Sequence, residues 1–438
     1  MRDPEAGLVL GEMKVTRQLR DPLPDGHFLR SKLAIRWVQE GRLVAYEHTS
    51  ERTLQAPRLP FVSQPTEWCD AQLHDAARFT LDLQSEAVSA GFDLKDASAW
   101  NVLFDGTKPV FCDLLSFVPL ADRAWWAAGQ FSRHFLLPLA VARLKALQAR
   151  SAFLVSRDGM HPDDARRILG AGRFLTRYWP AMAGGRAQAA IAPVAAGDSL
   201  RRIASYRQGL HTTLSWMLDG ARSRPKRPSV WADYRDERAH YPDGSVERKR
   251  QVVQAWLGRT RPGWVLDLGC NTGEFSQMAV ESGARVIALD GDHEAVQALY
   301  RSQLGSKSIH PIVATLDDLS GGRGWGGVEH PGLADRLAAQ SDMVLMLALV
   351  HHLMVSSAIP VEAVAGFVRR CTRRYAVVEW IDEGDPQMLL LCAQRQRQVA
   401  EFGIERQRSA FISAGFEVLE EVALTPGTRR LALLELRT

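Results

Sequence analysis

Two acids and two glycines in one short segment have the residue types and the spacing of a nucleoside-binding site. Asp267 ends a buried apolar run, the following turn carries Gly269 and Gly273, and Asp290 ends the next apolar run. A ligand can lie against the backbone of such a turn, because a side chain at either glycine would block its approach. An acid about twenty residues further on can accept hydrogen bonds from two ribose hydroxyls. The segment therefore predicts half of a nucleoside site.

The spacing of the glycines differs from that of a dinucleotide-binding fingerprint. That fingerprint is G-x-G-x-x-G before a helix whose N-terminus holds pyrophosphate. Here the chain has Asp267-x-Gly269-x-x-x-Gly273, with Asn271 between the glycines. Asparagine tolerates left-handed backbone better than most residues, so it suits such a turn. A tight turn without a ligand would account for the glycines, but not for acids at the ends of two buried runs.

Strand, turn and acid together resemble motif I of the class I S-adenosylmethionine (SAM) methyltransferases. In that family the glycine turn passes under the methionyl and ribose parts of SAM, and the acid of the second strand binds the ribose. The resemblance therefore implies SAM as the cofactor. It adds two neighbours of the motif, Cys270 and Gly291, to the expected cofactor site.

The loop after the third expected strand should border the adenine of SAM. By the spacing of the family, the acid that often faces the adenine amino group falls on Thr315, which is not an acid. Leu316 follows in the same loop, and Asp317 and Asp318 are near enough to take the place of the acid. The alternative is two acids on a solvated loop.

An aromatic segment before the first expected strand carries Trp231 and Tyr241, and Lys249 follows it. Aromatic rings stabilise a sulfonium by cation–π attraction of about 0.5–2 kcal/mol. We expect these three residues to close over SAM or over the methyl acceptor. The alternative is an amphipathic segment packed on the sheet.

Two adjacent imidazoles, His351 and His352, follow the fourth expected strand. Open α/β sheets bind ligands at the carboxyl ends of central strands, and imidazole can take up a proton near neutral pH. His352 is expected to line the pocket; the alternative is that His351 or His352 is a general base. Glu379 ends near the same edge, inside an apolar run, and would need a partner if buried. It is expected to orient a histidine or to bind a polar acceptor.

Strand and helix signals alternate after residue 228, which predicts a parallel sheet with helices on both faces. The last two strand-like runs flank Thr425-Pro-Gly-Thr428, so the sheet should end in an antiparallel hairpin. The expected strands are Trp264–Asp267, Arg285–Asp290, His310–Ala314, Asp342–Leu347, Tyr375–Ile381, Glu417–Leu424 and Arg430–Leu436. This pattern matches the seven-stranded, Rossmann-like sheet of class I methyltransferases, and the resemblance thus covers residues 228–438.

Residues 1–225 have a different pattern, which predicts a mixed, mostly helical domain. Short strand-like runs, such as Leu33–Val38 and Arg42–Glu47, come before a helical part that begins near Ala71 and includes a hairpin near 102–118. Amphipathic helices are expected over Leu139–Leu154, Pro162–Tyr178 and Ser199–Leu218. The basic, Pro-rich stretch 221–229 predicts a linker or an exposed crossing, and the alternative is a nucleic-acid-binding patch.

Asp96, Asn101 and Asp113 resemble the catalytic loop and the metal-binding acid of kinases. In kinases the first residue accepts the hydroxyl proton and the other two hold magnesium. The chain departs from that family, because no glycine-rich phosphate loop stands upstream and Leu-Leu-Ser follows Asp113. The alternative to a phosphotransferase site is a degenerate kinase-like lobe or chance turn chemistry.

Segments along nearly the whole chain resemble the nodulation-type (NoeA-like) methyltransferases. They are Pro60–Trp68, residues 94–118, Gln130–Pro138 and the segments around His351-His352 and Glu379. That family pairs such an N-terminal region with a SAM domain. The resemblance does not supply an acceptor.

The composition is that of a soluble globular protein, with 46% hydrophobic and 24% charged residues in a chain of 438. The 54 basic and 50 acidic residues leave a net charge of +4, too balanced to favour a nucleic-acid partner. Five scattered cysteines without a C-x-x-C pair predict neither disulfides nor a metal site, and they fit a cytoplasmic location. No apolar run reaches roughly 18 residues, so no membrane span is expected.

These observations together predict a two-part enzyme. Residues 1–225 would form an acceptor-recognition or scaffold domain, and residues 226–438 a class I SAM-dependent methyltransferase domain. The expected reaction moves the methyl group of SAM to a small-molecule, natural-product or glycan acceptor, with oxygen or nitrogen as the favoured nucleophile. The alternatives are phosphotransferase activity in the N-terminal half, or a SAM-binding partner protein without catalysis.

Overall fold

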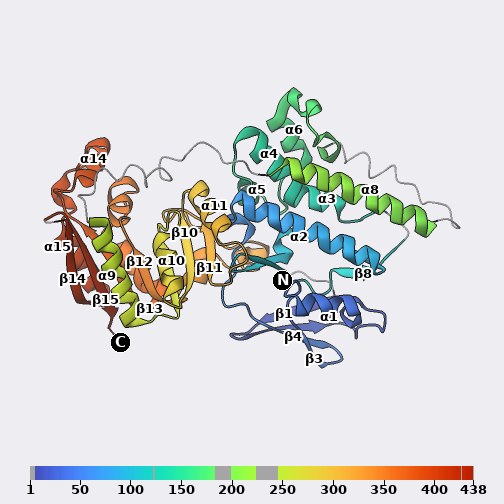
Figure 1. Cartoon of the computed structure of the whole chain (residues 1–438), viewed down its shortest axis with the longest axis horizontal. Helices are drawn as coiled ribbons and strands as arrows, with labels where there is room; N and C mark the ends of the chain where they lie inside the picture. The colour runs from blue at the N-terminus through green and yellow to red at the C-terminus, as the bar shows by residue number, and fades with distance from the viewer. Residues whose placement is uncertain (1–4, 122–123, 183–198, 223–244, 426, 438) are drawn as a thin grey trace. The chain divides into compact units, whose positions relative to one another are not determined.

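The chain divides into two compact units. The computed structural model describes residues 5–121, 124–182, 199–222, 245–425 and 427–437. The first unit comprises Met1–Arg224 with Arg323–Glu329, and the second comprises Pro225–Gly322 with His330–Thr438 (Figure 1). The sequence does not predict that Arg323–Glu329 belongs to the first unit. None of the helices in the described ranges is long and apolar enough to cross a membrane.

A seven-stranded sheet forms the centre of the second unit. Its spatial order is β11-β10-β9-β12-β13-β15-β14. The first five strands pair in parallel, whereas β15 is antiparallel to both β13 and β14. The strands are β9 (Trp264–Leu268), β10 (Arg285–Asp290), β11 (Ile309–Val313), β12 (Ser341–Met346), β13 (Thr372–Ile381), β14 (Phe416–Thr425) and β15 (Arg429–Leu436). The strand order reverses between β9 and β12, so their carboxyl ends flank the crevice where such sheets bind ligands.

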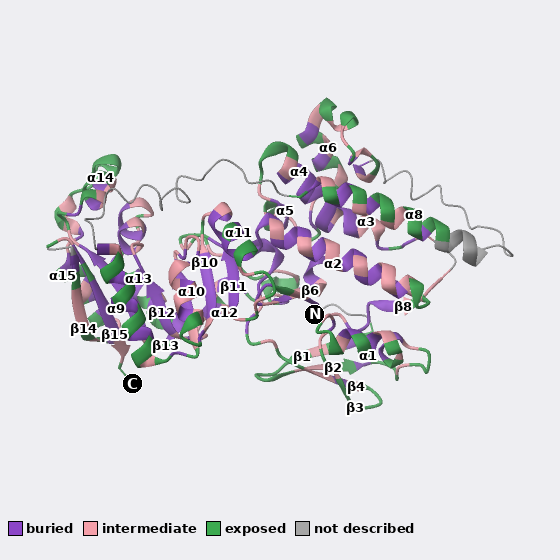
Figure 2. Cartoon of the chain, viewed as in Figure 1, coloured by how far each residue is buried: buried purple, intermediate pink, exposed green. Residues whose placement is uncertain are grey.

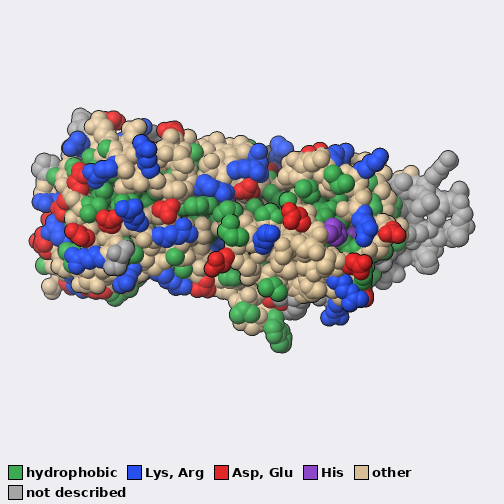
Figure 3. All heavy atoms as spheres, turned by 90° about the horizontal axis from the view of Figure 1, so that it is seen from below, with side chains coloured by type: hydrophobic (Ala, Val, Ile, Leu, Met, Phe, Trp, Pro, Cys, Tyr) green, Lys and Arg blue, Asp and Glu red, His purple; other side chains and the backbone are tan. Residues whose placement is uncertain are grey.

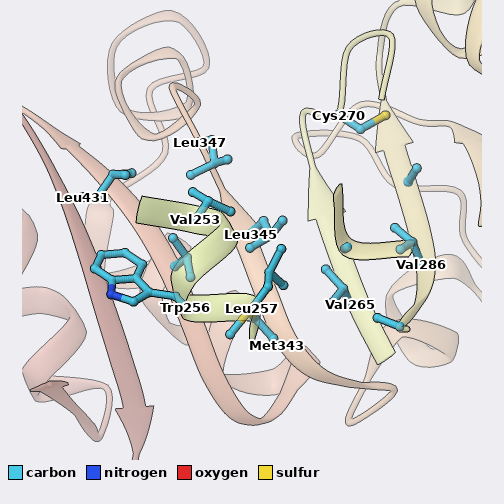
Figure 4. Packing of buried hydrophobic residues seen from close by; sticks show 14 of the residues in the cluster. Val253, Trp256, Leu257, Val265, Cys270, Val286, Met343, Leu345, Leu347 and Leu431 are labelled. Atoms are coloured by element: carbon cyan, nitrogen blue, oxygen red, sulfur yellow. The ribbon is translucent and has the colours of Figure 1, made fainter. Parts of the chain in front are cut away.

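The central strands are buried along nearly their whole length (Figure 2). Parallel strands that are covered on both faces have continuous apolar runs, which explains why the sequence places these strands within three residues of their observed bounds. Helix α9 (Ser245–Thr260) packs against the sheet through Val253, Trp256 and Leu257. These side chains share one hydrophobic core with Met343 and Leu431 (Figure 4).

Two helices of the second unit begin at residues whose side chains satisfy free backbone N–H groups. Asp292 accepts hydrogen bonds from two backbone N–H groups at the start of α11 (His293–Ser302), and Asp385 does the same for α14 (Pro386–Arg395). The other helices of this unit are α10 (Glu274–Glu281), α12 (Leu333–Leu337), α13 (Val361–Cys371) and α15 (Ile404–Ser413), with a π-helical turn at His352–Ser356 and a 3₁₀ turn at Val399–Glu401. The 3₁₀ turn at Trp325–Gly327 lies in the segment that belongs to the first unit.

The first unit combines small antiparallel sheets with helices. Its largest sheet has the order β1-β2-β4-β3, and two strand pairs, β5 with β8 and β6 with β7, lie beyond it. The strands are β1 (Ala6–Leu10), β2 (Lys14–Leu19), β3 (Glu47–Ser50), β4 (Thr53–Pro57), β5 (Phe92–Leu94), β6 (Val102–Asp105), β7 (Lys108–Phe111) and β8 (Phe117–Pro119). The helices are α1 (Lys32–Gln39), α2 (Asp70–Ser89), α3 (Ala128–Phe131), α4 (Leu137–Lys145), α5 (Ser151–Val155), α6 (Pro162–Leu169) and α8 (Ser199–Gly220), with a π-helical turn at Ser132–Leu136 and 3₁₀ turns at Phe28–Arg30, Pro65–Glu67, Ala99–Asn101 and Gly170–Leu175.

The expected strand Leu33–Val38 is wrong, because this segment forms helix α1. The Ser31 side chain accepts a hydrogen bond from the Ala34 backbone N–H at 3.1 Å and so caps the helix. Ala34 and Trp37, three residues apart, share the buried face, and the Trp37 ring centroid lies 5.1 Å from that of Phe117. Helical spacing of the buried residues therefore overrides the apparent alternation.

Three other expectations for the first unit need correction. The expected strand Arg42–Glu47 supplies only a bridge at Leu43 before β3 begins. The expected helix Leu139–Leu154 stops at Lys145, because Ala146 adopts left-handed backbone with φ of 56°. The expected helix Pro162–Tyr178 stops before Gly170, whose φ is 62°. Left-handed residues end α-helices.

Candidate functional site

A cavity of about 540 Å³ opens at the carboxyl ends of β9, β10 and β12, within the second unit. It lies where the order of the strands reverses, as expected for a ligand site in an open α/β sheet. Most of the expected cofactor residues line it: Lys249, Asp267, Gly269, Cys270, Asn271, Asp290, Gly291, Thr315, Leu316 and Asp317. Trp231 and Tyr241 fall outside the described residues.

The turn after β9 adopts the left-handed backbone that its sequence predicts. Gly269, Asn271 and Gly273 have φ of 75°, 49° and 85°. A Cβ atom at Gly273 would lie 2.4 Å from a methyl carbon of Leu299, which belongs to the buried core. Gly273 therefore accommodates the packing of Leu299, and it is not among the residues that line the cavity. Gly269 does line the cavity.

Two carboxylates at the ends of neighbouring strands face the cavity. Asp290 accepts hydrogen bonds from the backbone N–H groups of Asn271 and Asp292, each at 2.7 Å, and burial raises the pKa of Asp290 despite them. Asp267 is fully buried and accepts a hydrogen bond from Ser276 Oγ at 2.6 Å. Burial, with the charge of Asp290 adding to it, raises the pKa of Asp267 to about 6 although the Ser276 hydrogen bond opposes the shift.

The loop after β11 brings Thr315, Leu316 and Asp317 to the cavity, whereas Asp318 does not line it. Asp318 turns back on the loop, and its backbone N–H donates to the Thr315 carbonyl at 3.2 Å. Asp317 accepts a hydrogen bond from Ser357 Oγ at 2.8 Å. Of the two acids, Asp317 is therefore the one that lines the cavity.

His351 and His352 have different environments, although their ring centroids are 4.2 Å apart. His352 lines the cavity at the start of a π-helical turn, a feature frequent at functional sites. His351 is 2% exposed, does not line the cavity, and its Nδ1 has no hydrogen-bond partner among the described residues. Burial lowers the pKa of both imidazoles, that of His351 most strongly. Both side chains are therefore uncharged at neutral pH.

Glu379 lies beneath the cavity rather than in its lining. Its carboxylate is fully buried and receives hydrogen bonds from Lys249 Nζ at 2.5 Å and from Arg429 Nη1 at 3.3 Å. Burial alone would raise the pKa of Glu379, but the two cations outweigh it and hold the pKa below its usual value. Arg429 also binds Asp385 through Nε and Nη2, at 2.7 and 3.0 Å.

Sequence reasoning does not find Arg429 and Asp385, which complete this buried network. Asp385 precedes Pro386, which is a recognisable helix start, and Arg429 opens β15 opposite Ile381 of β13. Those local signals predict a cap and a strand end. They do not predict a salt bridge between residues 44 positions apart.

Comparison with known proteins gives the chain a family. No family model matches it. The nodulation protein NoeA of Rhizobium meliloti (strain 1021) is 31% identical over 421 residues, which cover 90% of this chain and 86% of that protein. The chain belongs to the NoeA family.

Solved structures that resemble this NoeA-family chain include several methyltransferases. Magnesium protoporphyrin IX methyltransferase from Synechocystis PCC 6803, with bound SAM, is 16% identical; the match covers 48% of this chain and 93% of that enzyme, with a TM-score of 0.34. The N-methyltransferase NodS from Bradyrhizobium japonicum WM9 is 12% identical over 45% of this chain and 99% of its own, with a TM-score of 0.33. Because these TM-scores are low, the fold assignment rests on the strand order itself, which is that of a class I methyltransferase sheet.

The three kinase-like residues of the NoeA-family chain lie near one another in the first unit. Asn101 Nδ2 donates to the Asp96 carbonyl at 3.3 Å, and burial together with the charge of Asp113 raises the pKa of Asp96. Arg17 Nη1 binds the Asp113 carboxylate at 2.8 Å. A guanidinium therefore occupies the carboxylate that would hold magnesium in a kinase. Within the described ranges, no group of three or more His, Cys, Asp or Glu side chains is placed to hold a metal ion.

Proposed function

We propose that the second unit transfers the methyl group of SAM to an oxygen or nitrogen atom of a small-molecule, natural-product or glycan acceptor. One observation carries this proposal. Asp267 and Asp290 face one cavity from the ends of neighbouring strands, on either side of a left-handed glycine turn. A nucleoside with a charged amino-acid tail presents a ribose to one acid and an ammonium group to the other.

Each end of SAM has a matching group in the cavity. Asp290 has backbone donors fixing its orientation, and the remaining lone pairs of its carboxylate can accept from two ribose hydroxyls. The Asp267 carboxylate, ionised above a pH of about 6, can pair with the ammonium of the methionyl part. Lys249 Nζ can pair with the methionyl carboxylate, because Lys249 lines the same cavity. Leu316 and Asp317 border the space left for adenine.

Bound SAM would supply a methyl group on a sulfonium that is already activated for in-line transfer, so the contribution of the protein is orientation and removal of a proton. His352, Ser356 and Ser357 line the cavity near the start of the π-helical turn. Because the pKa of His352 is lowered, its imidazole is neutral at pH 7 and can accept the proton that the acceptor nucleophile loses. If the acceptor is an amine that is already neutral, His352 instead shapes the pocket.

The charge distribution supports a small acceptor over a nucleic acid. The net charge is only +4, and Lys and Arg side chains are interspersed with Asp and Glu on the face shown in Figure 3. Binding to a phosphate backbone needs a concentrated basic surface. The first unit is proposed to recognise the acceptor or to act as a scaffold.

The test is a methyl-transfer assay with purified protein, methyl-labelled SAM and a cell extract separated into small molecules, glycans, protein and nucleic acid. Label is expected in the small-molecule or glycan fraction, on oxygen or nitrogen. The control is Asp290→Ala, which should lose transfer because it loses the ribose contact. Label confined to nucleic acid would refute the proposed acceptor class, and no transfer to any fraction despite SAM binding would favour a partner protein without catalysis.

A further inference from the structure

A buried chain of four charged side chains lies behind the cavity. Lys249 Nζ contacts one oxygen of Glu379 at 2.5 Å, and Arg429 Nη1 contacts the other at 3.3 Å. Arg429 then binds Asp385 with two further hydrogen bonds. The side chains of all four are at most 9% exposed. This network joins helix α9, strands β13 and β15, and the N-cap residue of α14, and Lys249 is the member that lines the cavity.

Among the residues that the structure describes, Lys249 has one anionic side chain at hydrogen-bonding distance, Glu379, and several weaker electrostatic neighbours. The ring of Phe275 lies 5.1 Å from Nζ. The charge of Lys249 also acts on Asp267 of β9 and on His351 beyond β12. On the neighbouring turns, Arg250 is paired with Glu274 at 3.3 Å. His351 is neutral at pH 7, so Glu379 is the carboxylate that compensates the Lys249 ammonium at hydrogen-bonding distance.

We propose that Glu379 is a positioning residue that keeps Lys249 charged and aimed at the methionyl carboxylate of SAM, and that the Arg429–Asp385 pair holds Glu379 in place. A buried ammonium without an anion tends to lose its proton, because a low-dielectric environment disfavours the charged form. A neutral amine would no longer attract a carboxylate. This inference rests on the proposed function, and it assigns Glu379 to cofactor binding rather than to the acceptor.

The network also explains how a charged pair is kept at a ligand site. Arg429 makes two hydrogen bonds to Asp385 and a third to Glu379. Glu379 is therefore shared between two cations, Arg429 and Lys249. Those cations hold the pKa of Glu379 below its usual value, so Glu379 remains an anion at all pH values where the enzyme would work. An arriving carboxylate can then bind Lys249 without first recruiting a proton.

The experiment measures SAM affinity by calorimetry between pH 7 and pH 9, above the range where Asp267 titrates. Over this range the wild-type affinity should follow only the titration of the ammonium group of SAM, which every variant shares. In Glu379→Gln, which keeps the size of the side chain, the affinity should fall a further tenfold or more relative to the wild type as the pH rises, because the Lys249 ammonium has lost its anionic partner. Lys249→Met should bind SAM weakly at every pH. Glu420→Gln, which removes an exposed partner of Arg259, is the matched control and should follow the wild type.

Each outcome separates the inference from the proposed function. A Glu379→Gln variant that binds SAM with the wild-type pH profile overturns the inference alone. A wild-type chain that does not bind SAM overturns the proposed function as well. If Glu379→Gln fails to fold, the double variant Glu379→Gln/Lys249→Met carries the test, because removing both members of a buried pair is far less costly than removing one. Weak SAM binding by the double variant supports the contact between Lys249 and the SAM carboxylate on which the inference depends, and wild-type affinity in it overturns the inference.

Discussion

Asp267→Asn should make the unliganded protein more stable at pH 8 and should weaken its binding of SAM. The substitution removes the buried charge and keeps the size of the side chain, and the amide oxygen can still accept the Ser276 hydrogen bond. The folded state raises the pKa of Asp267 from 3.8 to about 6. Because the folded state favours the protonated carboxyl, this group adds to the free energy of unfolding at low pH, and the addition is lost as the pH rises through about 6. At pH 8 the ionised, buried carboxylate therefore lowers the free energy of unfolding relative to a neutral side chain.

The magnitude follows from the shift. Two pKa units correspond to about 3 kcal/mol, because one unit is about 1.4 kcal/mol. The melting temperature of the asparagine variant should therefore rise by roughly 6–12 °C at pH 8 at most, since 1 kcal/mol shifts a domain of this size by roughly 2–4 °C. At pH 5 the gain should be about half as large. SAM affinity should fall roughly 10- to 150-fold, because a hydrogen bond to a charged group contributes about 1.5–3 kcal/mol.

Thermal melts of the unliganded protein at pH 5 and pH 8, and calorimetric titration with SAM at pH 8, measure the two effects. The matched control is Asp335→Asn, which neutralises an exposed acid paired with Arg370 and should change neither quantity. A lower melting temperature for Asp267→Asn at pH 8 would refute the assigned cost of burial. Wild-type SAM affinity in that variant would refute the assignment of Asp267 to the ammonium group.

Four further variants test other parts of the chain. Asp290→Ala should weaken SAM binding by about 1.5–3 kcal/mol in calorimetry, because the ribose hydroxyls lose a charged acceptor; unchanged affinity would mean that the ribose lies elsewhere. His352→Ala should keep SAM affinity within about threefold. A 10²- to 10⁴-fold loss of turnover, with disappearance of a limb of the pH–rate profile below pH 6.5, indicates a general base, because burial lowers the pKa of His352 from 6.5. A smaller loss, mainly in the KM of the acceptor, indicates that His352 shapes the pocket. Wild-type turnover at every pH excludes both roles. Gly273→Ala should lower the melting temperature rather than block SAM alone, because the new methyl group meets Leu299; a fully stable variant would contradict this. Asp113→Asn should leave SAM binding unchanged, and saturable magnesium–ATP binding by the wild type that this variant loses would instead support a phosphotransferase site.

The parts of the site that lie on one linear segment could be predicted from the sequence. Asp267 and Asp290 end two buried strands, and parallel strands that are covered on both faces can be recognised in a sequence as apolar runs. The left-handed backbone at Gly269 and Asn271 also follows from residue type. Chain-local chemistry of this kind needs no knowledge of tertiary contacts.

The parts that depend on distant contacts could not be predicted. Glu379 is buried with Lys249 and Arg429, which lie 130 and 50 positions away. The apolar run around Glu379 does not indicate which cations will contact this acid in the folded chain. Helix α1 could not be predicted for the same reason, because its buried face packs against Phe117, which is distant in the sequence.

The role of a glycine also needs the structure. Gly269 and Gly273 have similar φ angles, 75° and 85°, and belong to the same motif. Only the positions of their neighbours separate a glycine that borders the ligand cavity from one that accommodates Leu299 in the core. Residue type predicts the backbone conformation of each glycine, whereas the neighbouring residues determine whether it borders the cavity or packs in the core.

Calorimetric titration of the wild-type chain of 438 residues with SAM and with its demethylated product tests the central claim most directly. The cavity between β9 and β12 predicts saturable binding of both ligands at one site per chain, with roughly micromolar affinity, equivalent to about −8 kcal/mol. The absence of both binding heat and a thermal shift with either ligand would contradict the claim that this cavity is a SAM site.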